Sequence, residues 1–543
     1  MNKKIISLLL ILCMLIGCMS LYACNDGEGT SSETTTEEAT SGNADTPDDT
    51  VKLNIIDDNY RNWYEIFVHS FYDTNNDGIG DLKGVTAKLD YIQEMGFNGI
   101  WLMPIHPSPT YHKYDVKDYY AIDPQYGTLQ DLDTLVTEAH KRGIKVILDL
   151  VLNHSSDQHP WFKEACRYIR ENGEVGGAYG EYYNFSTENL GGYSPVSGTN
   201  YYYESRFWSG MPDLNLNSEA VRSEIVDIME YWLVDHNVDG FRLDAVTSYY
   251  TGHVDKNVEF LSWVNTESER IKPGCYVVGE AWEGSDYQIN RYYESGIDSF
   301  FLFTGSQATG SIASLVKQNS GKQLGELMMK LQESYPNGIP APFLGNHDTM
   351  RPGSFMPGME NVKMAAGVMS MMTGGCFVYY GEEIGMISKG GHNSDPAKRI
   401  AMKWQAKSMY EGCCYLPPEN TPVDETSYYY PSVEEQLNDP DSILNYYKQA
   451  MLLRNMFPSI ARGEVEYFPD AENSYICTIK KTYKDETITI VFNLDSFEQT
   501  VAVDSSKLGF TELVGELRAD TTSEVSWDGT TLHMPPYSIV IFK

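Results

Sequence analysis

Short apolar segments alternate with amphipathic helical stretches along the chain from about residue 60. Residues 89–96 and 132–143 carry apolar side chains at helical spacing, and each stretch ends at a glycine. Eight apolar segments have the length of strands: 63–71, 98–105, 144–151, 238–246, 275–282, 297–304, 340–348 and 375–383. Eight alternating units predict an α/β fold, a closed (β/α)8 TIM barrel. An open doubly wound sheet is the alternative, although no G-x-G-x-x-G loop follows the first strand.

The alternation breaks at two places, and these breaks divide the chain. Residues 154–213 are rich in tyrosine, glycine, asparagine and serine and follow the third strand, so they predict a small inserted domain over the barrel mouth. After the helix at 442–457 only strands follow, at 475–483, 487–494, 499–504 and 530–543. The sequence therefore predicts a barrel from 56–153 and 214–458 and a C-terminal antiparallel β-sandwich from 459–543.

The first 24 residues have the pattern of an export signal rather than of a folded element. Cys18 and Cys24 each follow small residues, as in a bacterial lipoprotein signal, and the polar chain begins directly after Cys24. We expect a lipid at Cys24, or at Cys18, that tethers the protein to the outer face of the cell membrane. A cleaved signal that releases a secreted protein, or a single membrane anchor, is the alternative. Residues 25–55 predict a disordered acidic linker.

The composition excludes one class of partner and favours others. The formal net charge of −36 predicts poor binding to nucleic acid, because affinity for phosphate comes from Lys and Arg. The charge favours a neutral substrate or a cation instead. Aromatic residues make up 13% of the chain, and such rings suit sugar stacking as well as cores. The cysteine spacing matches neither a zinc site nor a disulfide framework, the adjacent Cys413 and Cys414 have no evident role, and no pattern predicts the oligomeric state.

Charged and polar residues gather at the C-terminal ends of the predicted strands. In barrel enzymes the active site lies at that end of the barrel. Four strands end in this way, with Asp149 followed by Asn153 and His154, Arg242 with Asp244, Glu280, and Asn346 with His347 and Asp348. A single acidic residue at a strand end is commonly the cap of the next helix. Four such strand ends on one rim favour a catalytic site over helix caps.

Carboxylates on neighbouring strands suit glycoside hydrolysis. A retaining enzyme needs a nucleophilic carboxylate and a carboxylic acid roughly 5–5.5 Å apart, and neighbouring strands lie about 4.8 Å apart. Arg242 and Asp244 are two residues apart in a strand and share a face, so the arginine should keep Asp244 ionised. Glu280 lies between Val278 and Trp282, an apolar setting that would raise its pKa for work as an acid.

The motifs at these strand ends resemble those of glycoside hydrolase family 13, the α-amylase family. The likeness rests on DLVLNH (149–154), MPDLN (211–215), GFRLDAV (240–246), VVGEAW (277–282), FLGNHD (343–348), YYGEEIGM (379–386) and RIAMKW (399–404). The resemblance implies Asp244 as nucleophile, Glu280 as general acid/base and Asp348 as a third carboxylate that binds sugar hydroxyls. It further implies sugar contacts from Tyr114, His154, Arg242, His347 and Arg351, with Asp149 ordering its loop. Some relatives that lack the catalytic carboxylates serve as partners, but all three are present here.

The segment DTNNDGIGD (73–81) has oxygen-bearing side chains at alternate positions and a glycine suited to a turn. It begins like an EF-hand loop, but Gly84 stands where the bidentate glutamate would fall. The segment resembles a calcium loop found in oligosaccharide-active family members. That resemblance implies a structural Ca2+ held by the side chains of Asp73, Asn75, Asp77 and Asp81 and the Ile79 carbonyl. A solvated acidic turn is the alternative.

The resemblance also suggests a substrate. Ala245 directly follows the implied nucleophile, where a small residue is associated with α-1,4 linkages, whereas MPDLN leaves mixed specificity open. We expect a retaining α-amylase-like enzyme acting on starch and malto-oligosaccharides. The alternatives are an exo-acting oligo-α-glucosidase (α-1,4 or α-1,6), a neopullulanase or a glucanotransferase. A surface starch-binding protein without catalysis is the alternative from another class.

Overall fold

The structure is a computed structural model that describes residues 57–388, 395–420 and 430–543. The predicted signal, both candidate lipid-bearing cysteines (Cys18 and Cys24) and the acidic linker (25–55) lie outside the described residues. Within the described ranges, every helix is too short or too polar to span a lipid bilayer.

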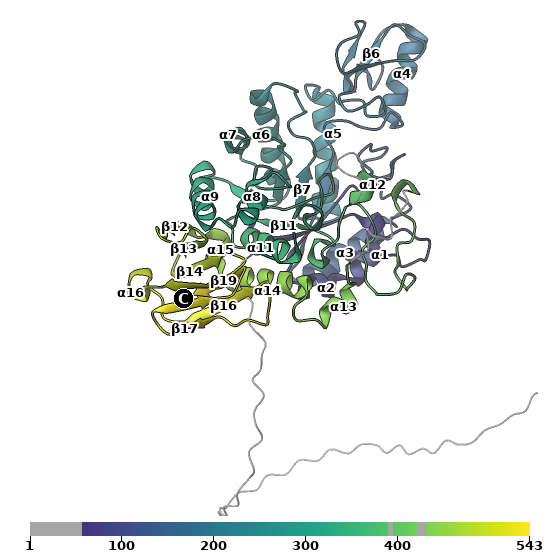
Figure 1. Ribbon diagram of the computed structural model, residues 1–543. Coiled ribbons are helices and arrows are strands. Elements are labelled where there is room, and N and C mark those ends of the chain that lie inside the picture. Colours follow the sequence, from purple (N-terminus) through teal and green to yellow (C-terminus); the bar gives the residue numbers. More distant parts are fainter. Residues whose placement is uncertain (1–56, 389–394, 421–429) are drawn as a thin grey trace, which may run out of the picture. The chain divides into compact units, whose positions relative to one another are not determined.

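Eight parallel strands form one sheet, shown at the centre of the molecule in Figure 1. In sheet order they are β10 (Ile339–Ala341), β9 (Ser299–Phe301), β8 (Tyr276–Gly279), β7 (Gly240–Leu243), β3 (Lys145–Leu150), β2 (Gly99–Leu102), β1 (Asn62–Ile66) and β11 (Cys376–Tyr379). Backbone hydrogen bonds from Gly375 N to Pro340 O (2.9 Å) and from Phe377 N to Pro342 O (3.0 Å) join the two edge strands. The predicted (β/α)8 barrel is confirmed.

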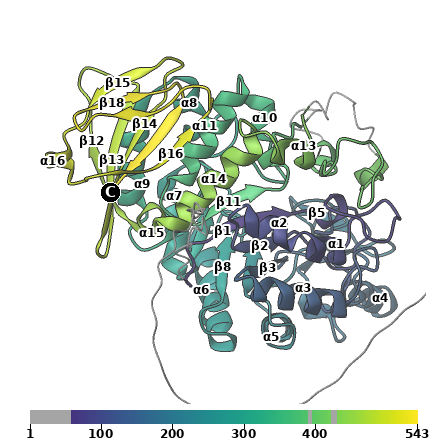
Figure 2. The ribbon, with the colours of Figure 1, turned by 90° about the horizontal axis from the view of Figure 1, so that it is seen from below.

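The barrel strands are buried on both faces, which explains why they appear in the sequence as continuous apolar runs. The interior is filled by aromatic rings: Trp63 stacks on Tyr276 with ring centres 4.8 Å apart and on Phe377 at 5.7 Å. Figure 2 shows helices outside the strands. They include α2 (Leu89–Glu94), α3 (Leu129–Lys141), α5 (Glu219–Glu230), α6 (Val254–Ile271), α9 (Gly321–Ser334), α11 (Met359–Ser370) and α14 (Ile443–Met456). The barrel core therefore holds the strand ends, and the site they carry, in fixed positions.

The segment between β3 and β7 contains α4 (Pro160–Asn172) and a small antiparallel sheet of β4 (Phe185–Ser186), β6 (Tyr202–Glu204) and β5 (Tyr193–Pro195). It has few aliphatic residues, and aromatic contacts replace them: the Phe162 ring meets those of Tyr183 and Tyr203 at 5.0 and 4.7 Å. An isolated bridge between His154 and Asp213 ties the two ends of the segment together. The predicted inserted domain after strand three is confirmed.

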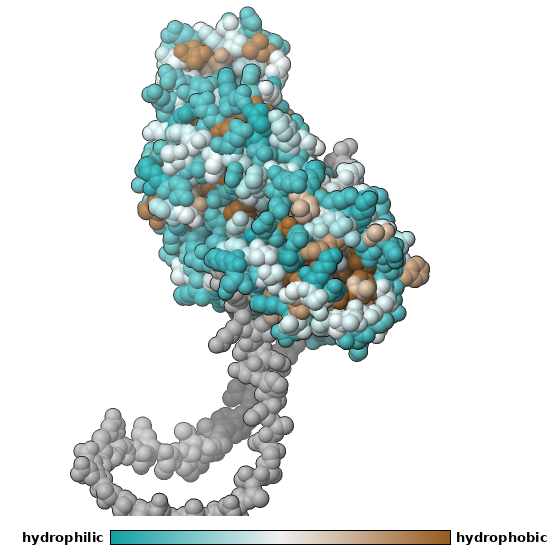
Figure 3. Space-filling model, turned by 90° about the vertical axis from the view of Figure 1, so that its left-hand side faces the viewer, coloured by the Kyte–Doolittle hydropathy of each residue, from teal (hydrophilic) through white to brown (hydrophobic). Residues whose placement is uncertain are grey.

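The C-terminal strands form two antiparallel sheets. One contains β12 (Glu464–Phe468), β13 (Ile476–Tyr483), β14 (Glu486–Asn493), β19 (Ser538–Phe542) and β16 (Leu513–Arg518); the other contains β15 (Gln499–Ala502), β18 (Thr531–Met534) and β17 (Ser526–Trp527). Apolar side chains between them, including Val491, Leu532 and Val540, form a separate core. The buried Lys481 of β13 donates to Met371 O (3.0 Å) just after α11, which attaches the predicted sandwich to the barrel. Figure 3 shows that polar residues cover most of one face of the molecule, with apolar residues in separate patches.

Candidate active site

Arg242 joins the two central carboxylates predicted from the sequence. It lies in β7 and is fully buried, and its Nη1 donates to Asp244 Oδ1 at 2.7 Å. Its Nη2 lies 3.0 Å from Glu280 Oε1, at the end of β8. A single guanidinium group therefore bridges Asp244 and Glu280. The carboxylates share a site, as expected for residues at the ends of neighbouring strands.

Asp149 forms a third ion pair with the same arginine. Arg242 Nη1 donates to Asp149 Oδ1 at 2.9 Å, and the two residues are Cα partners in the β3–β7 register. Asp149 Oδ2 accepts a hydrogen bond from Tyr114 Oη at 3.1 Å. Asp149 thus contacts the side chains of the site directly, whereas the family resemblance implied only a role in ordering its loop.

Glu280 has the environment of a general acid. The side chain is buried, and its Oε2 accepts from Ala245 N at 2.9 Å. Burial raises the pKa of Glu280 to about 7, the negative charges of Asp244 and Asp348 act in the same direction, and Arg242 opposes them. A carboxyl group with this pKa still carries its proton near neutral pH, which a proton donor requires.

Ala245 adopts a left-handed backbone conformation, with φ of +48°. That conformation directs the Ala245 N–H toward Glu280. A β-branched side chain is strained at such a φ, whereas alanine costs less. The backbone therefore gives a physical reason for a small residue after Asp244.

Asp348 and His347 form a second charged group beside the first. His347 Nε2 lies 3.1 Å from Asp348 Oδ2 and 2.7 Å from Tyr114 Oη, while its Nδ1 lies 2.5 Å from Glu65 Oε1. Burial opposes the charge on His347, but Asp348 and Glu65 raise the pKa of the ring to about 9. Burial likewise opposes the charge on Asp348, but protonated His347 and then Arg399 hold its pKa well below the usual range. Both residues are charged at neutral pH.

His154 is buried beside the inserted segment. Its backbone carbonyl accepts from Tyr119 Oη at 2.8 Å, and its ring meets Phe207 with centres 5.2 Å apart. Among the described residues, its Nε2 has no hydrogen-bond partner. Burial lowers the pKa of the ring, so it is neutral and can offer a polar atom to a ligand.

Arg351 is the predicted sugar contact that the structure does not bring to the carboxylates. Its Nε donates to Lys398 O at 3.2 Å, its Nη1 donates to Tyr380 O, and its guanidinium lies 4.2 Å from the centre of the Tyr379 ring. The chain turns after Asp348, so Arg351 faces the segment that follows β11. These bonds do not support the predicted contact with sugar.

Two residues that the structure places at the site were not predicted from the sequence. Glu65 lies in β1 and holds His347, and Arg399 pairs with Asp348. The sequence could have indicated Glu65, because it is a charged residue inside the apolar run 63–68, just as Arg242 is a charged residue inside its apolar strand. Arg399 stands in the motif RIAMKW, but that motif did not indicate what the residue does.

The acidic loop that follows β1 is a turn held by its own hydrogen bonds. All five predicted calcium ligands lie in it: Asp73, Asn75, Asp77, Ile79 and Asp81. Asp73 Oδ1 accepts from the backbone N–H groups of Asn75 and Asn76, and Asp81 Oδ1 caps the helix α1 (Leu82–Ala87) by accepting from Gly84 N. In the part of the chain that the structure describes, no three His, Cys, Asp or Glu side chains converge as metal ligands. The carboxylates thus stabilise the turn itself, and the calcium ligands stay a prediction.

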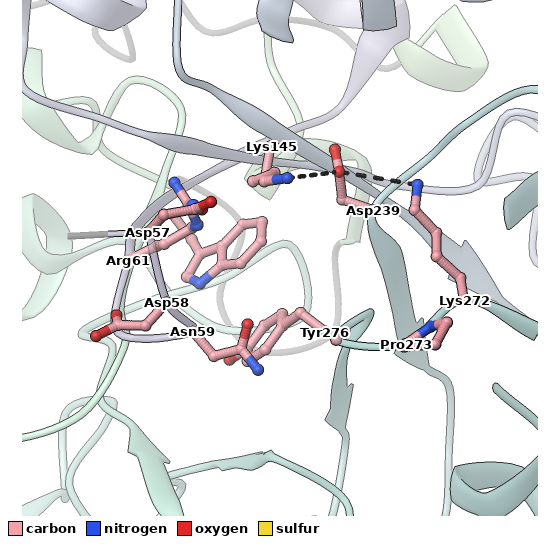
Figure 4. A pocket seen from close by; sticks show the side chains of 11 residues that line it. Asp57, Asp58, Asn59, Arg61, Lys145, Asp239, Lys272, Pro273 and Tyr276 are labelled. Atoms are coloured by element: carbon pink, nitrogen blue, oxygen red, sulfur yellow. Dashed lines mark hydrogen bonds and ion pairs between the residues drawn. The ribbon is translucent and has the colours of Figure 1, made fainter. Parts of the chain in front are cut away.

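A cavity of about 430 Å3 opens at the opposite end of the barrel, among the N-terminal ends of the strands (Figure 4). Its charges pair with one another: Lys145 and Lys272 lie 3.2 and 4.0 Å from Asp239, and Arg61 lies 2.6 Å from Asp57. The cavity contains no pair of carboxylates bridged as Asp244 and Glu280 are. The site at the C-terminal strand ends is therefore the better candidate for catalysis.

The chain also matches a known family model, described as the catalytic domain of alpha-amylase, over residues 65–463. The chain belongs to the α-amylase family. It is therefore a glycoside hydrolase of family 13, and the matched region contains every strand end that carries the site. The family explains why the site residues come from five strands of one barrel.

Several α-amylase family relatives resemble the chain over nearly its whole length. Alpha-amylase 3 of Dictyoglomus thermophilum is 35% identical over 496 residues, covering 89% of this chain and 93% of that protein. An oligo-1,6-glucosidase of Heyndrickxia coagulans is 30% identical over 566 residues, covering 88% of this chain and 98% of that protein. The solved structure of Amy13B from Eubacterium rectale has a TM-score of 0.85 and 42% identity, covering 90% of this chain and 96% of that one. These relatives support the family and differ in the activity that their names give.

Proposed function

We propose that this glycosidase hydrolyses α-1,4-glucosidic bonds of starch and malto-oligosaccharides with retention of configuration, as an α-amylase does. The observation that carries the proposal is the Arg242 guanidinium, which holds Asp244 and Glu280 together at the rim of the barrel. A carboxylate and a carboxylic acid held beside one another are the pair that double displacement requires. The relative named alpha-amylase 3 and the small residue Ala245 support the linkage.

In the first step, a carboxylate oxygen of Asp244 attacks the anomeric carbon while the bond from that carbon to the leaving oxygen breaks. Glu280 gives its proton to the leaving oxygen, which departs as a sugar hydroxyl. In the second step, Glu280, now ionised, takes a proton from water, and the resulting hydroxide oxygen attacks the same carbon. The ester bond to Asp244 breaks, which restores both residues and gives a product with the original configuration.

The other side chains would hold the sugar that reacts. Asp348, ionised between His347 and Arg399, would bind sugar hydroxyls and favour the distorted ring. His154 would offer its unpaired Nε2, and Tyr114, whose ring stacks on His347 at 5.6 Å, would present its other face to the sugar. Arg242 would hold Asp244 and Glu280 in place through its two ion pairs.

Product analysis tests this proposal against its alternatives. The protein is incubated with maltoheptaose, starch, pullulan and isomaltose, and the products are separated by length over time. We expect maltoheptaose and starch to give mixed short malto-oligosaccharides from the first minutes. Release of glucose alone, or faster cleavage of isomaltose, would instead support the second candidate, an oligo-α-glucosidase, which the Heyndrickxia coagulans relative favours. Binding of starch without any cleavage would contradict both.

The pKa of Glu280 sets an expected pH dependence. Because the proton donor has a pKa of about 7 and must be protonated, kcat/KM should be highest below that pH and fall as the pH rises through 7. Asp348, with its lowered pKa, and His347, with a pKa of about 9, stay charged over this range and do not cause the fall. Initial rates on maltoheptaose from pH 4 to 10 measure it, and constant kcat/KM up to pH 9 would contradict the assignment of the acid.

Calcium stays a proposal that rests on the sequence of the acidic loop. Each carboxylate oxygen that accepts a hydrogen bond in the turn has a second lone pair free for a cation, so the turn could bind Ca2+ after small movements of its side chains. We expect 1 mM Ca2+, added after treatment with EDTA, to raise Tm by about 2–4 °C, and Asp77→Ala to remove the rise. Calorimetry measures this, and an identical Tm in EDTA and in calcium would leave the loop as a solvated turn.

The proposed location also rests on sequence alone. A lipid on Cys24, or on Cys18, would place the enzyme on the outer face of the cell membrane, with residues 25–55 as a spacer. Labelling of growing cells with a fatty acid tests this, because Cys24→Ser should abolish the label and release the protein. Retention of the label in Cys24→Ser but not in Cys18→Ser would move the lipid to Cys18.

A further inference from the structure

Arg399 contacts the third carboxylate of the site directly. The residue is 3% exposed, its Nη2 lies 2.8 Å from Asp348 Oδ1, and its Nε donates to His347 O at 3.2 Å. The same guanidinium thus holds both the side chain of Asp348 and the backbone of the residue before it. Arginine suits this work because its donors have fixed directions and its charge is permanent.

The two oxygens of Asp348 have different cationic partners. Oδ1 pairs with Arg399, and Oδ2 pairs with His347 Nε2 at 3.1 Å. The first partner comes from the segment after β11 and the second from the segment after β10. The Asp348 side chain is 30% exposed, and these two ion pairs hold its carboxylate from both sides.

The position of Arg399 is itself set by the barrel. Ser70, just after β1, donates through its hydroxyl to Arg399 O at 2.7 Å, and Met402 N donates to Ser70 O at 2.8 Å. On the other side, Arg399 Nη1 donates to Tyr111 Oη at 3.3 Å. The guanidinium therefore approaches Asp348 from a backbone that is anchored at two points.

We propose that Arg399 is a positioning residue that fixes the direction and the charge of Asp348. The inference rests on the proposed function, in which Asp348 binds the distorted sugar. Without Arg399, His347 is the cationic partner of the carboxylate that remains among the described residues, and the Oδ1 side could rotate away. The effect would be felt most in the transition state, where the contact of Asp348 with the sugar is strongest.

A double-mutant cycle tests the proposal. Arg399→Met should lower kcat/KM by about 10- to 100-fold, mostly through kcat, because it removes a buried charge-assisted contact. In a protein that already carries Asp348→Ala, the same change should cost less than about threefold, because its target is gone. Arg399→Lys should recover part of the loss. Equal losses in both backgrounds, or no loss in Arg399→Met, would overturn the proposal.

A matched control separates positioning from general stability. Arg454 is also a buried arginine, but it donates to the backbone carbonyls of Ser370 and Met372, away from the site. Arg454→Met should lower Tm and leave kcat/KM within about threefold. A fall in kcat/KM as large as that of Arg399→Met would overturn the proposal. If Arg399→Met fails to fold, the cycle is run with Arg399→Lys, and additive losses there would overturn it equally.

Acarbose, an inhibitor with a flattened charged ring, makes the test independent of the natural substrate. Its affinity, measured by calorimetry, should fall about 10-fold or more in Arg399→Met and little further when Asp348→Ala is also present. If the wild type cleaved isomaltose instead of maltoheptaose, only the proposed α-1,4 linkage would be rejected. The acarbose affinities of the single and double variants would still decide the role of Arg399. Additive losses of affinity would overturn that role.

Discussion

Asp244→Asn is expected to lower kcat on maltoheptaose by about 1000-fold or more, because an amide cannot form the ester that carries the sugar between the two steps. The change keeps the size of the side chain, and Arg242 keeps its pairs with Asp149 and Glu280, so the fold should persist. Reducing-sugar release measures kcat, and calorimetry should give a Tm within about 3 °C of the wild type.

The control for this variant is Asp239→Asn. Asp239 is also a buried aspartate paired with cations, but it lies in the cavity at the opposite end of the barrel. Its loss should lower Tm, because Lys145 and His140 lose their partner, and should leave kcat within about threefold. If Asp244→Asn kept a tenth of the wild-type activity, or behaved as Asp239→Asn does, Asp244 would not be the nucleophile.

Glu280→Gln is expected to have the second largest effect, and the size should depend on the leaving group. On maltoheptaose, kcat should fall by about 1000-fold, because the leaving oxygen no longer receives a proton. On α-glucosyl fluoride, whose leaving group needs little help, the first step should be slowed far less. Parallel rate measurements on the two substrates test this.

The pH profile gives an independent check on the same residue. Glu280→Gln should lose the fall in rate near pH 7 that the raised pKa of Glu280 causes in the wild type. An equal loss on both substrates, or an unchanged alkaline limb, would show that another group gives the proton.

Much of the fold was predictable because it depends on local pattern. The eight barrel strands are buried on both faces, so each appears as an apolar run, and the order of strands and helices then implies the barrel. The strands β12, β16 and β17 were missed, because they are short or carry exposed polar residues, and only their place in the sandwich makes them strands. Tertiary packing decides such segments.

The centre of the site was predictable for a geometric reason. Once the barrel is assumed, residues at the ends of neighbouring strands must lie together, which places Asp244, Glu280 and Arg242 in contact. Residues in the long loops had no such constraint. Arg351 was expected at the sugar and packs instead on Tyr379, whereas Arg399, about 50 residues beyond Asp348 in sequence, reaches it.

If Asp244 is the nucleophile, the peptide that contains it should gain mass when the protein reacts with 5-fluoro-α-glucosyl fluoride. This substrate forms the covalent intermediate of a retaining enzyme and slows its hydrolysis, so the sugar stays attached. We expect mass spectrometry to find one added fluoroglucosyl group on the peptide that carries Asp244, and none in Asp244→Asn. An unmodified peptide together with full turnover, or a label on another residue, would contradict it.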